Sequence, residues 1–215
     1  MRKISLFLLC LILPGCVPHP RDVTLFALAP AQPGQNLTVP LLLAPIDSAP
    51  IYMSKDMLYR LNYTDNQLHP YGGSSWNAPP IDLFASVMRQ TGGDNLLTMD
   101  QFTQSARCAL RIELTSFEQV FTDAQNSHAE LDLHFSLMQL RNHRELARSK
   151  LHMEVTAQTA DARGGAQALD KASHQAASQI IGWLNHALAP ADSGSNPVLT
   201  ACKNQYDIIS IIRSP

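Results

Sequence analysis

The chain has 215 residues, of which 45% are hydrophobic and 16% are charged, and its formal net charge is −2 at pH 7. An apolar fraction of this size can fill the core of one domain, which excludes a chain that is disordered throughout. The 16 Lys and Arg residues are balanced by 18 Asp and Glu residues. The sequence therefore offers neither the basic surface that nucleic acid requires nor a polybasic patch for anionic lipid head groups, and we expect no nucleic-acid partner.

The N-terminus predicts export followed by lipid attachment. A basic start, Met1-Arg2-Lys3, precedes an apolar stretch over residues 4–13. This stretch has the shape of a signal-peptide core and about half the length of a spanning helix. The next residues, Leu13-Pro14-Gly15-Cys16, resemble the lipobox of bacterial lipoproteins, with Pro14 in place of the usual small or β-branched residue. We predict a signal peptide over residues 1–15 and lipidation of Cys16; an ordinary signal peptide or N-terminal anchor with a chance cysteine is the alternative.

The residue after the cysteine bears on the membrane address. Val17 stands where lipoproteins retained in the inner membrane of enteric-type bacteria carry an aspartate. We therefore expect the protein at the periplasmic face of the outer membrane, held by its lipid, with residues 16–23 as a tether. No second apolar run approaches spanning length, so the lipid is the membrane attachment that the sequence predicts.

Two cysteines remain once the signal peptide and the lipidation site are accounted for. Cys10 leaves with the signal peptide and Cys16 takes the lipid, which leaves Cys108 and Cys202. A pair of cysteines in an oxidising compartment can form a disulfide. Two separately buried thiols are the alternative, because free cysteine is among the most buried residue types. The sequence leaves both open.

Residues 24–190 predict one domain, whose first half mixes strands with a helix. Pro79 and Pro80 suit the first turn of a helix, and Gly92-Gly93 suit its end. Leu83, Phe84, Val87 and Met88 would form its apolar stripe. We expect strands over Thr24–Leu28, Val39–Ile46, Met57–Tyr63, Leu68–Tyr71 and Asn95–Phe102, the third and fourth of them as a hairpin.

The second half of the domain predicts a meander covered by a helix. Apolar and polar residues alternate around Leu110–Leu114, Leu131–Leu137 and Leu151–Val155, which indicates three antiparallel strands with one dry and one wet face. From Ala166 to Leu188 the apolar residues recur at helical spacing, after Gly164-Gly165. The expected fold class is α/β: a mixed, largely antiparallel sheet with two main helices packed against it. Residues 191–215 read as a linker and tail, with a final strand over Tyr206–Ile212.

Eight histidines raise the question of a metal site. The densest group comprises His128, His134 and His152, with Glu130, Asp132 and Glu154 nearby. A zinc site needs three or four converging ligands with outer-shell support, and no spacing here matches a known ligand pattern. We therefore interpret these residues as solvated strand faces and predict no metal site.

Motifs for nucleophilic catalysis or phosphate binding are equally thin. No serine stands in a Gly-x-Ser-x-Gly elbow. Gly72-Gly73-Ser74-Ser75 lacks the lysine that a phosphate-binding loop requires. We predict neither a catalytic site nor a cofactor.

Residues 49–83 carry a resemblance to a known family. Met57-Leu58-Tyr59-Arg60-Leu61 is followed by Tyr71 and then by Ser74-Ser75-Trp76-Asn77-Ala78-Pro79-Pro80-Ile81-Asp82-Leu83. This order is similar to that of the ABC-type transport auxiliary lipoproteins, the PqiC-like proteins that accompany MCE-domain lipid transport systems. Ala49-Pro50-Ile51-Tyr52-Met53 stands where the family has a Pro-x-Tyr-Leu segment. Ser75 stands where the family often has a basic residue before the tryptophan, and Ser54-Lys55 stands where it has an acidic-basic pair. The resemblance extends over residues 24–188.

The resemblance implies a non-enzymatic accessory lipoprotein. Its partners would be an MCE-domain protein and ABC-type transporter components, which it would dock at the outer membrane. A lipid- or solute-binding periplasmic lipoprotein is the alternative and would need a cavity between helix and sheet. A periplasmic hydrolase would need clustered titratable groups in a cleft. The sequence is also compatible with a homo-oligomer.

The same segment supplies the candidates for a docking surface: Tyr52, Tyr59, Arg60, Tyr71 and Trp76. Tyrosine suits partly wet contacts, because it joins a rigid apolar ring to a polar tip. We expect Tyr52 to face outward, since it follows a loop entry at Pro50-Ile51. For Trp76 we favour a core position beside the helix start, with partner binding as the alternative.

Overall fold

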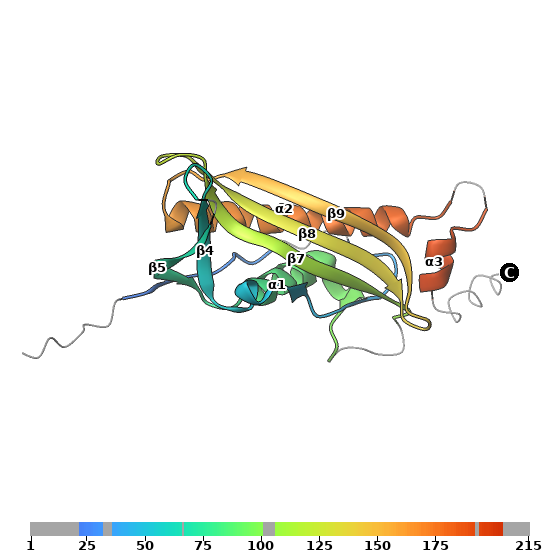
Figure 1. Ribbon diagram of the computed structural model, residues 1–215. Coiled ribbons are helices and arrows are strands. Elements are labelled where there is room, and N and C mark those ends of the chain that lie inside the picture. The colour runs from blue at the N-terminus through green and yellow to red at the C-terminus, as the bar shows by residue number, and fades with distance from the viewer. Residues whose placement is uncertain (1–21, 32–35, 66, 101–105, 192–193, 204–215) are drawn as a thin grey trace, which may run out of the picture.

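The computed structural model describes residues 22–31, 36–65, 67–100, 106–191 and 194–203. Its centre is a nine-stranded mixed sheet with helices against one face, so the predicted fold class is confirmed. The sheet is long and twisted, and the longest helix runs beside it (Figure 1). No described helix combines the length and the apolar character needed to cross a membrane. The predicted signal peptide, Cys16 and the strand over Tyr206–Ile212 lie outside the described residues.

The predicted meander forms the largest part of the sheet. It consists of β7 (Cys108–Phe121), β8 (Ser127–Gln139) and β9 (Arg144–Thr156), paired antiparallel in that order. Alternate residues of β7 and β8, among them Leu110 and Leu131, are fully buried on the helix side, as the alternation predicts. A register shift between Leu114 and Ser116 changes the phase of β7, so that Phe117 pairs with Leu131 on the covered face and Glu118 pairs with Glu130 on the open face.

The strands before the meander extend the sheet around β7. The hairpin of β4 (Asp56–Leu61) and β5 (Leu68–Trp76) is antiparallel, as predicted, and β4 pairs parallel with β7. The strand expected over Val39–Ile46 is shorter than predicted, because proline lacks the N–H that a central strand needs: Pro40 precedes it and Pro45 follows it. The remaining strands are β1 (Thr24–Phe26), β2 (Leu41–Leu43), β3 (Asp47–Ser48) and β6 (Leu96–Leu97).

Two helices cover one face of this sheet. The first, α1 (Pro80–Gly92), begins and ends where its prolines and glycines predict, and the glycine after it, Gly93, has a φ of 65°. The second, α2 (Ala162–Ala187), begins four residues before the predicted start, because the side chain of Asp161 accepts a hydrogen bond from Gly164 N at 2.8 Å. Gly165 therefore lies inside the helix, where a Cβ would stand 2.0 Å from Gln119 Oε1.

A short helix that the sequence analysis missed follows the linker. It is α3 (Pro197–Cys202), whose first turn is capped by the Asn196 side chain. Cys202 at its end is bonded to Cys108 at the start of β7, with the two Cα atoms 5.2 Å apart. The disulfide joins the C-terminal segment to the sheet, at the end remote from the β4–β5 hairpin (Figure 1).

Removal of this disulfide should lower the free energy of unfolding, because the bond restricts the conformations of the unfolded chain. The bond closes a separation of 94 residues, for which the chain-entropy model gives about 4–5 kcal/mol. We expect Cys108→Ser/Cys202→Ser protein to lose free energy of unfolding on this scale in urea, compared with the oxidised wild type. Mass spectrometry of unfolded, alkylated protein from the periplasm checks the bond itself; two alkylated thiols in the wild type would contradict it.

Candidate functional site

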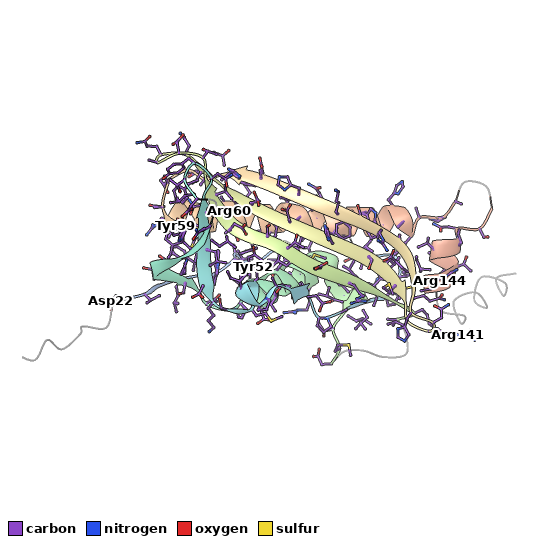
Figure 2. The ribbon with its side chains drawn as sticks, in the orientation of Figure 1. Asp22, Tyr52, Tyr59, Arg60, Arg141 and Arg144 are labelled. Carbon is purple, nitrogen blue, oxygen red and sulfur yellow. A yellow bond between two sulfur atoms is a disulfide. The ribbon has the colours of Figure 1, made fainter. Side chains whose placement is uncertain are left out.

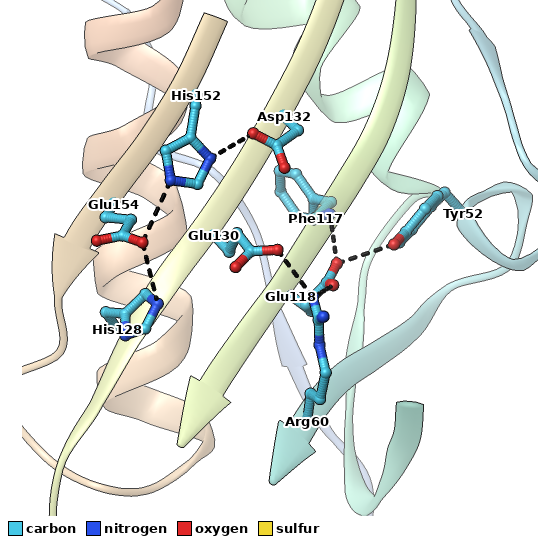
Figure 3. Close-up of polar contacts among 9 residues, drawn as sticks. All are labelled: Tyr52, Arg60, Phe117, Glu118, His128, Glu130, Asp132, His152 and Glu154. Carbon is cyan, nitrogen blue, oxygen red and sulfur yellow. Dashed lines mark hydrogen bonds and ion pairs between the residues drawn. The ribbon is translucent and has the colours of Figure 1, made fainter. Parts of the chain in front are cut away.

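Three glutamates stand side by side on the open face of the sheet. Glu118 on β7 pairs with Glu130 on β8, which in turn pairs with Glu154 on β9. Like charges directly opposite one another on neighbouring strands destabilise a sheet. A row of three carboxylates therefore needs cationic or hydrogen-bonding partners, and the surrounding side chains supply them (Figure 3).

Arg60 neutralises the first two members of this row. It reaches over from β4, and its Nη2 donates to Glu118 Oε1 and, at 2.8 Å, to Glu130 Oε1. The Glu118 side chain is 2% exposed, whereas that of Arg60 is 21% exposed. The charge of Arg60, which was predicted as a docking residue, is thus paired with two carboxylates of the same chain.

The prediction that Tyr52 faces outward is wrong. Tyr52 lies in a 3-10 turn over Pro50–Met53 and is 3% exposed, while Ile51 and Met53 on either side of it are exposed. Its hydroxyl donates to Glu118 Oε2 at 2.8 Å, and the Phe117 backbone N–H donates to the same oxygen at 2.7 Å. The physical reason is the buried carboxylate, which needs donors for both of its oxygens.

Burial determines the protonation preferences of this pair. It raises the pKa of Glu118, against the lowering effects of the hydrogen bonds from Tyr52 and Phe117 and the charge of Arg60. Burial, together with the charge of Glu118, raises the pKa of Tyr52 well above its ordinary range. Tyr52 is therefore a neutral donor at every physiological pH.

A second set of contacts serves Glu154 at the other end of the row. His152 lies between two carboxylates, with Nδ1 2.5 Å from Asp132 Oδ1 and Nε2 3.2 Å from Glu154 Oε1. His128 Nε2 lies 3.8 Å from the same Glu154 oxygen. The hydrogen bond to Asp132 is the main cause that raises the pKa of His152. Chemically, this end of the row can exchange protons or bind cations.

The remaining docking candidates divide between core and surface. Trp76 is fully buried, and its ring packs edge-on against Phe117 with centroids 5.5 Å apart, which fits the core position that we favoured. Tyr59 and Tyr71 are half-buried on the β4–β5 hairpin, with ring centroids 4.7 Å apart. Tyr63 in the hairpin turn is 49% exposed.

Sequence reasoning missed Glu118, the most buried acidic group of the site. The phase change in β7 moves Glu118 to the open face, where Arg60 and Tyr52 cover it. The one available signal was the break in alternation over Ser116-Phe117-Glu118-Gln119, which indicates a bulge but no partner.

In the described residues, a mixed sheet carries two main helices on one face and leaves the other face open. The sequence model of the ABC-type transport auxiliary lipoprotein component matches residues 24–181. The chain belongs to this family, which confirms the resemblance drawn from residues 49–83. It is accordingly a membrane-anchored auxiliary lipoprotein of an ABC-type transport system.

Solved structures share the fold. A crystal structure of a Xanthomonas campestris protein has a TM-score of 0.65 and 19% identity, over 75% of this chain and 94% of that one. A crystal structure of an uncharacterised protein has a TM-score of 0.58 and 11% identity, over 76% and 99% of the two chains. At these identities the likeness concerns the fold alone. A comparison with curated proteins finds no match.

The buried carboxylate makes Arg60 important for stability. We expect Arg60→Met to lower the free energy of unfolding by about 3 kcal/mol, because it leaves Glu118 buried without its cation. The double variant Arg60→Met/Glu118→Met should recover part of this loss, and Tyr52→Phe should cost about 1.5–3 kcal/mol. Urea unfolding of each variant measures these differences.

Arg111→Met is the matched control, because Arg111 pairs with Asp47 at 3.4 Å on an exposed part of the same face. Exposed pairs contribute about 0–1 kcal/mol. Equal losses of free energy of unfolding in Arg60→Met and Arg111→Met would show that the buried ion pair stabilises the fold no more than an exposed one.

Proposed function

We propose that this protein is a non-enzymatic accessory subunit of an MCE/ABC-type lipid transport system, anchored at the periplasmic face of the outer membrane. Membership of the auxiliary lipoprotein family is the observation that carries the proposal. The lipobox-like Leu13-Pro14-Gly15-Cys16 and Val17 support the anchor and its address. The Tyr-Arg-Leu, Trp and Pro-Pro order in residues 57–83 supports the PqiC-like assignment and hence the MCE-domain partner.

Tethering is the proposed mechanism. A lipid on Cys16 would hold the domain within the reach of a seven-residue spacer, which spans at most about 25 Å. A partner bound to the domain is then kept near the membrane, which raises its effective concentration there without any further contact. Such a role needs a rigid domain and a docking surface, and it needs no catalytic group.

We place the docking surface on the β4–β5 hairpin and define it by Tyr59, Tyr63 and Tyr71. Tyr63 is exposed, and Tyr59 and Tyr71, which lie on the strands on either side of the hairpin turn, are half-buried. The hydroxyl of Tyr71 donates to Gln119 Oε1 at 2.7 Å, which fixes its ring against β7. Rigid, partly wet tyrosines are typical of interfaces. Tyr52, Arg60 and Trp76 would support this surface from within.

The alternative of a lipid-binding domain finds no support in the packing of the described residues. The space between α2 and the sheet is filled by fully buried side chains, including Leu169, Ala172 and Ile180. A hollow of about 790 Å³ lies on the open face instead, lined by charged groups such as Arg111, Glu113 and Lys150. Acyl chains favour apolar linings, so this hollow does not suit them.

Lipid attachment is tested by metabolic labelling with palmitate. Wild-type protein should be labelled and should fractionate with the outer membrane, whereas Cys16→Ser protein should remain unlabelled and leave the membrane fraction, because a lipid at Cys16 is its proposed anchor. Labelling of both proteins would refute attachment at Cys16. Recovery of the wild type with the inner membrane would refute the address alone.

Docking is tested by capture of purified MCE-domain proteins from the same organism. Tyr63→Ala should weaken capture, since the ring is exposed, and it should leave the thermal midpoint unchanged. Arg141→Ala is the control, because Arg141 lies at the opposite end of the molecule from Tyr59 (Figure 2). Unchanged capture by Tyr63→Ala protein would count against the hairpin surface. Failure of the wild type to bind any MCE-domain protein would count against the function.

A further inference from the structure

Three side chains that the sequence analysis treated as solvated come together on β8 and β9. His128, Glu130 and Glu154 each offer one ligand atom, and these atoms all lie within 4.8 Å of one another. A fourth group, His152, directs its Nε2 at the Glu154 carboxylate from 3.2 Å (Figure 3). We infer that His128, Glu130, Glu154 and His152 form a binding site for a divalent transition-metal ion of the Zn²⁺ type.

The distances suit such an ion after small side-chain rotations. Zinc–ligand bonds of about 2.0–2.2 Å place neighbouring tetrahedral ligands roughly 3.4 Å apart. Both imidazole Nε2 atoms already approach one oxygen, Glu154 Oε1, at 3.2 Å from His152 and 3.8 Å from His128. To share one coordination shell, the ligand atoms must close from within 4.8 Å of one another to about 3.4 Å, through rotations about the ends of these side chains.

The sheet holds the ligands in place. Glu130 and Glu154 are direct cross-strand partners, and His128 is two residues before Glu130 on the same face of β8. Two carboxylates in this relation repel each other. Arg60 offsets the charge of Glu130 from the β4 side, and a cation between the strands would offset that of Glu154.

Asp132 supplies the outer-shell contact that metal-binding histidines usually have. A neutral imidazole has one donor nitrogen and one acceptor nitrogen. When His152 Nδ1 donates to Asp132 Oδ1, at 2.5 Å, its Nε2 presents a lone pair toward Glu154. A metal ion that takes the place of the Nε2 proton would be coordinated by Nε2 and by Glu154 Oε1, while the Nδ1–H group keeps its hydrogen bond to Asp132. A carboxylate, a histidine and a metal in this order recur in protein metal sites.

The ligand types select the ion. Imidazole nitrogen with carboxylate oxygen suits zinc and its neighbours in the first transition series. Calcium and magnesium prefer ligand sets made of oxygen alone. We therefore expect Zn²⁺ and Co²⁺ to bind, and we expect that an excess of Mg²⁺ does not displace them.

The test is calorimetric titration of the full mature lipoprotein in detergent, stripped with a chelator, with Zn²⁺. One ion per chain should bind. His128→Asn and Glu154→Gln should each weaken binding by more than about tenfold relative to the wild type, and Asp132→Asn should weaken it by about tenfold. With Co²⁺, the visible absorption band of a four-coordinate nitrogen and oxygen site should appear in the wild type and be lost in both ligand variants.

His134→Asn and Glu113→Gln are the matched controls. His134 Nδ1 lies 3.7 Å from Glu113 Oε2, farther along the same face, so this pair has the same chemistry in another place. Both controls should bind Zn²⁺ as tightly as the wild type does. Without metal, every variant should have the same thermal midpoint as the metal-free wild type. Absence of saturable binding, or binding that persists in the His128→Asn/Glu154→Gln double variant, would overturn the proposal. So would equal weakening in the controls.

Discussion

The close approach of α2 to the sheet determines how the rest of the molecule is arranged. Its inner face is built from small residues such as Ala172 and Ala176, both fully buried, and Gly165 lets the first turn meet Gln119 of β7 without a side chain between them. A helix this close excludes water from the sheet beneath it, so most side chains there are apolar. The buried polar pair of Gln119 and Ser127 satisfies itself, because Gln119 Nε2 donates to Ser127 Oγ at 2.8 Å. Most polar residues that alternate with the core along β7, β8 and β9 lie on the other face.

The open face then carries the chemistry, and β4 connects it to the core. Because β4 runs parallel beside the end of β7, Arg60 reaches the carboxylates that the β7 bulge turns outward. Tyr52 covers Glu118 from the preceding turn. Tyr52 and Arg60, both candidates for a docking surface from the sequence, thus meet at one buried carboxylate instead.

The arrangement of the two ends suits an anchored accessory protein. Asp22, at the start of the described chain, lies at the same end as Tyr59, whereas Arg141 and Arg144 lie at the other end (Figure 2). The disulfide between Cys108 and Cys202 secures that far end. A single lipid anchor would thus hold one end of an elongated domain and leave its long open face accessible to other components.

Local patterns in the sequence were sufficient for the largest elements: the alternation of β7, β8 and β9, the prolines and glycines that bound α1, and the helical spacing of α2. They also carried the family resemblance, because it rests on order and spacing. The pairing of Glu118 with Arg60 and Tyr52 could not be predicted, because these residues are 58 and 66 positions apart and meet only when β4 pairs with β7. The meeting of His128 and Glu154 likewise depends on strand register. Periodicity determines which face a side chain occupies, whereas its neighbours on that face are decided by the tertiary packing of strands.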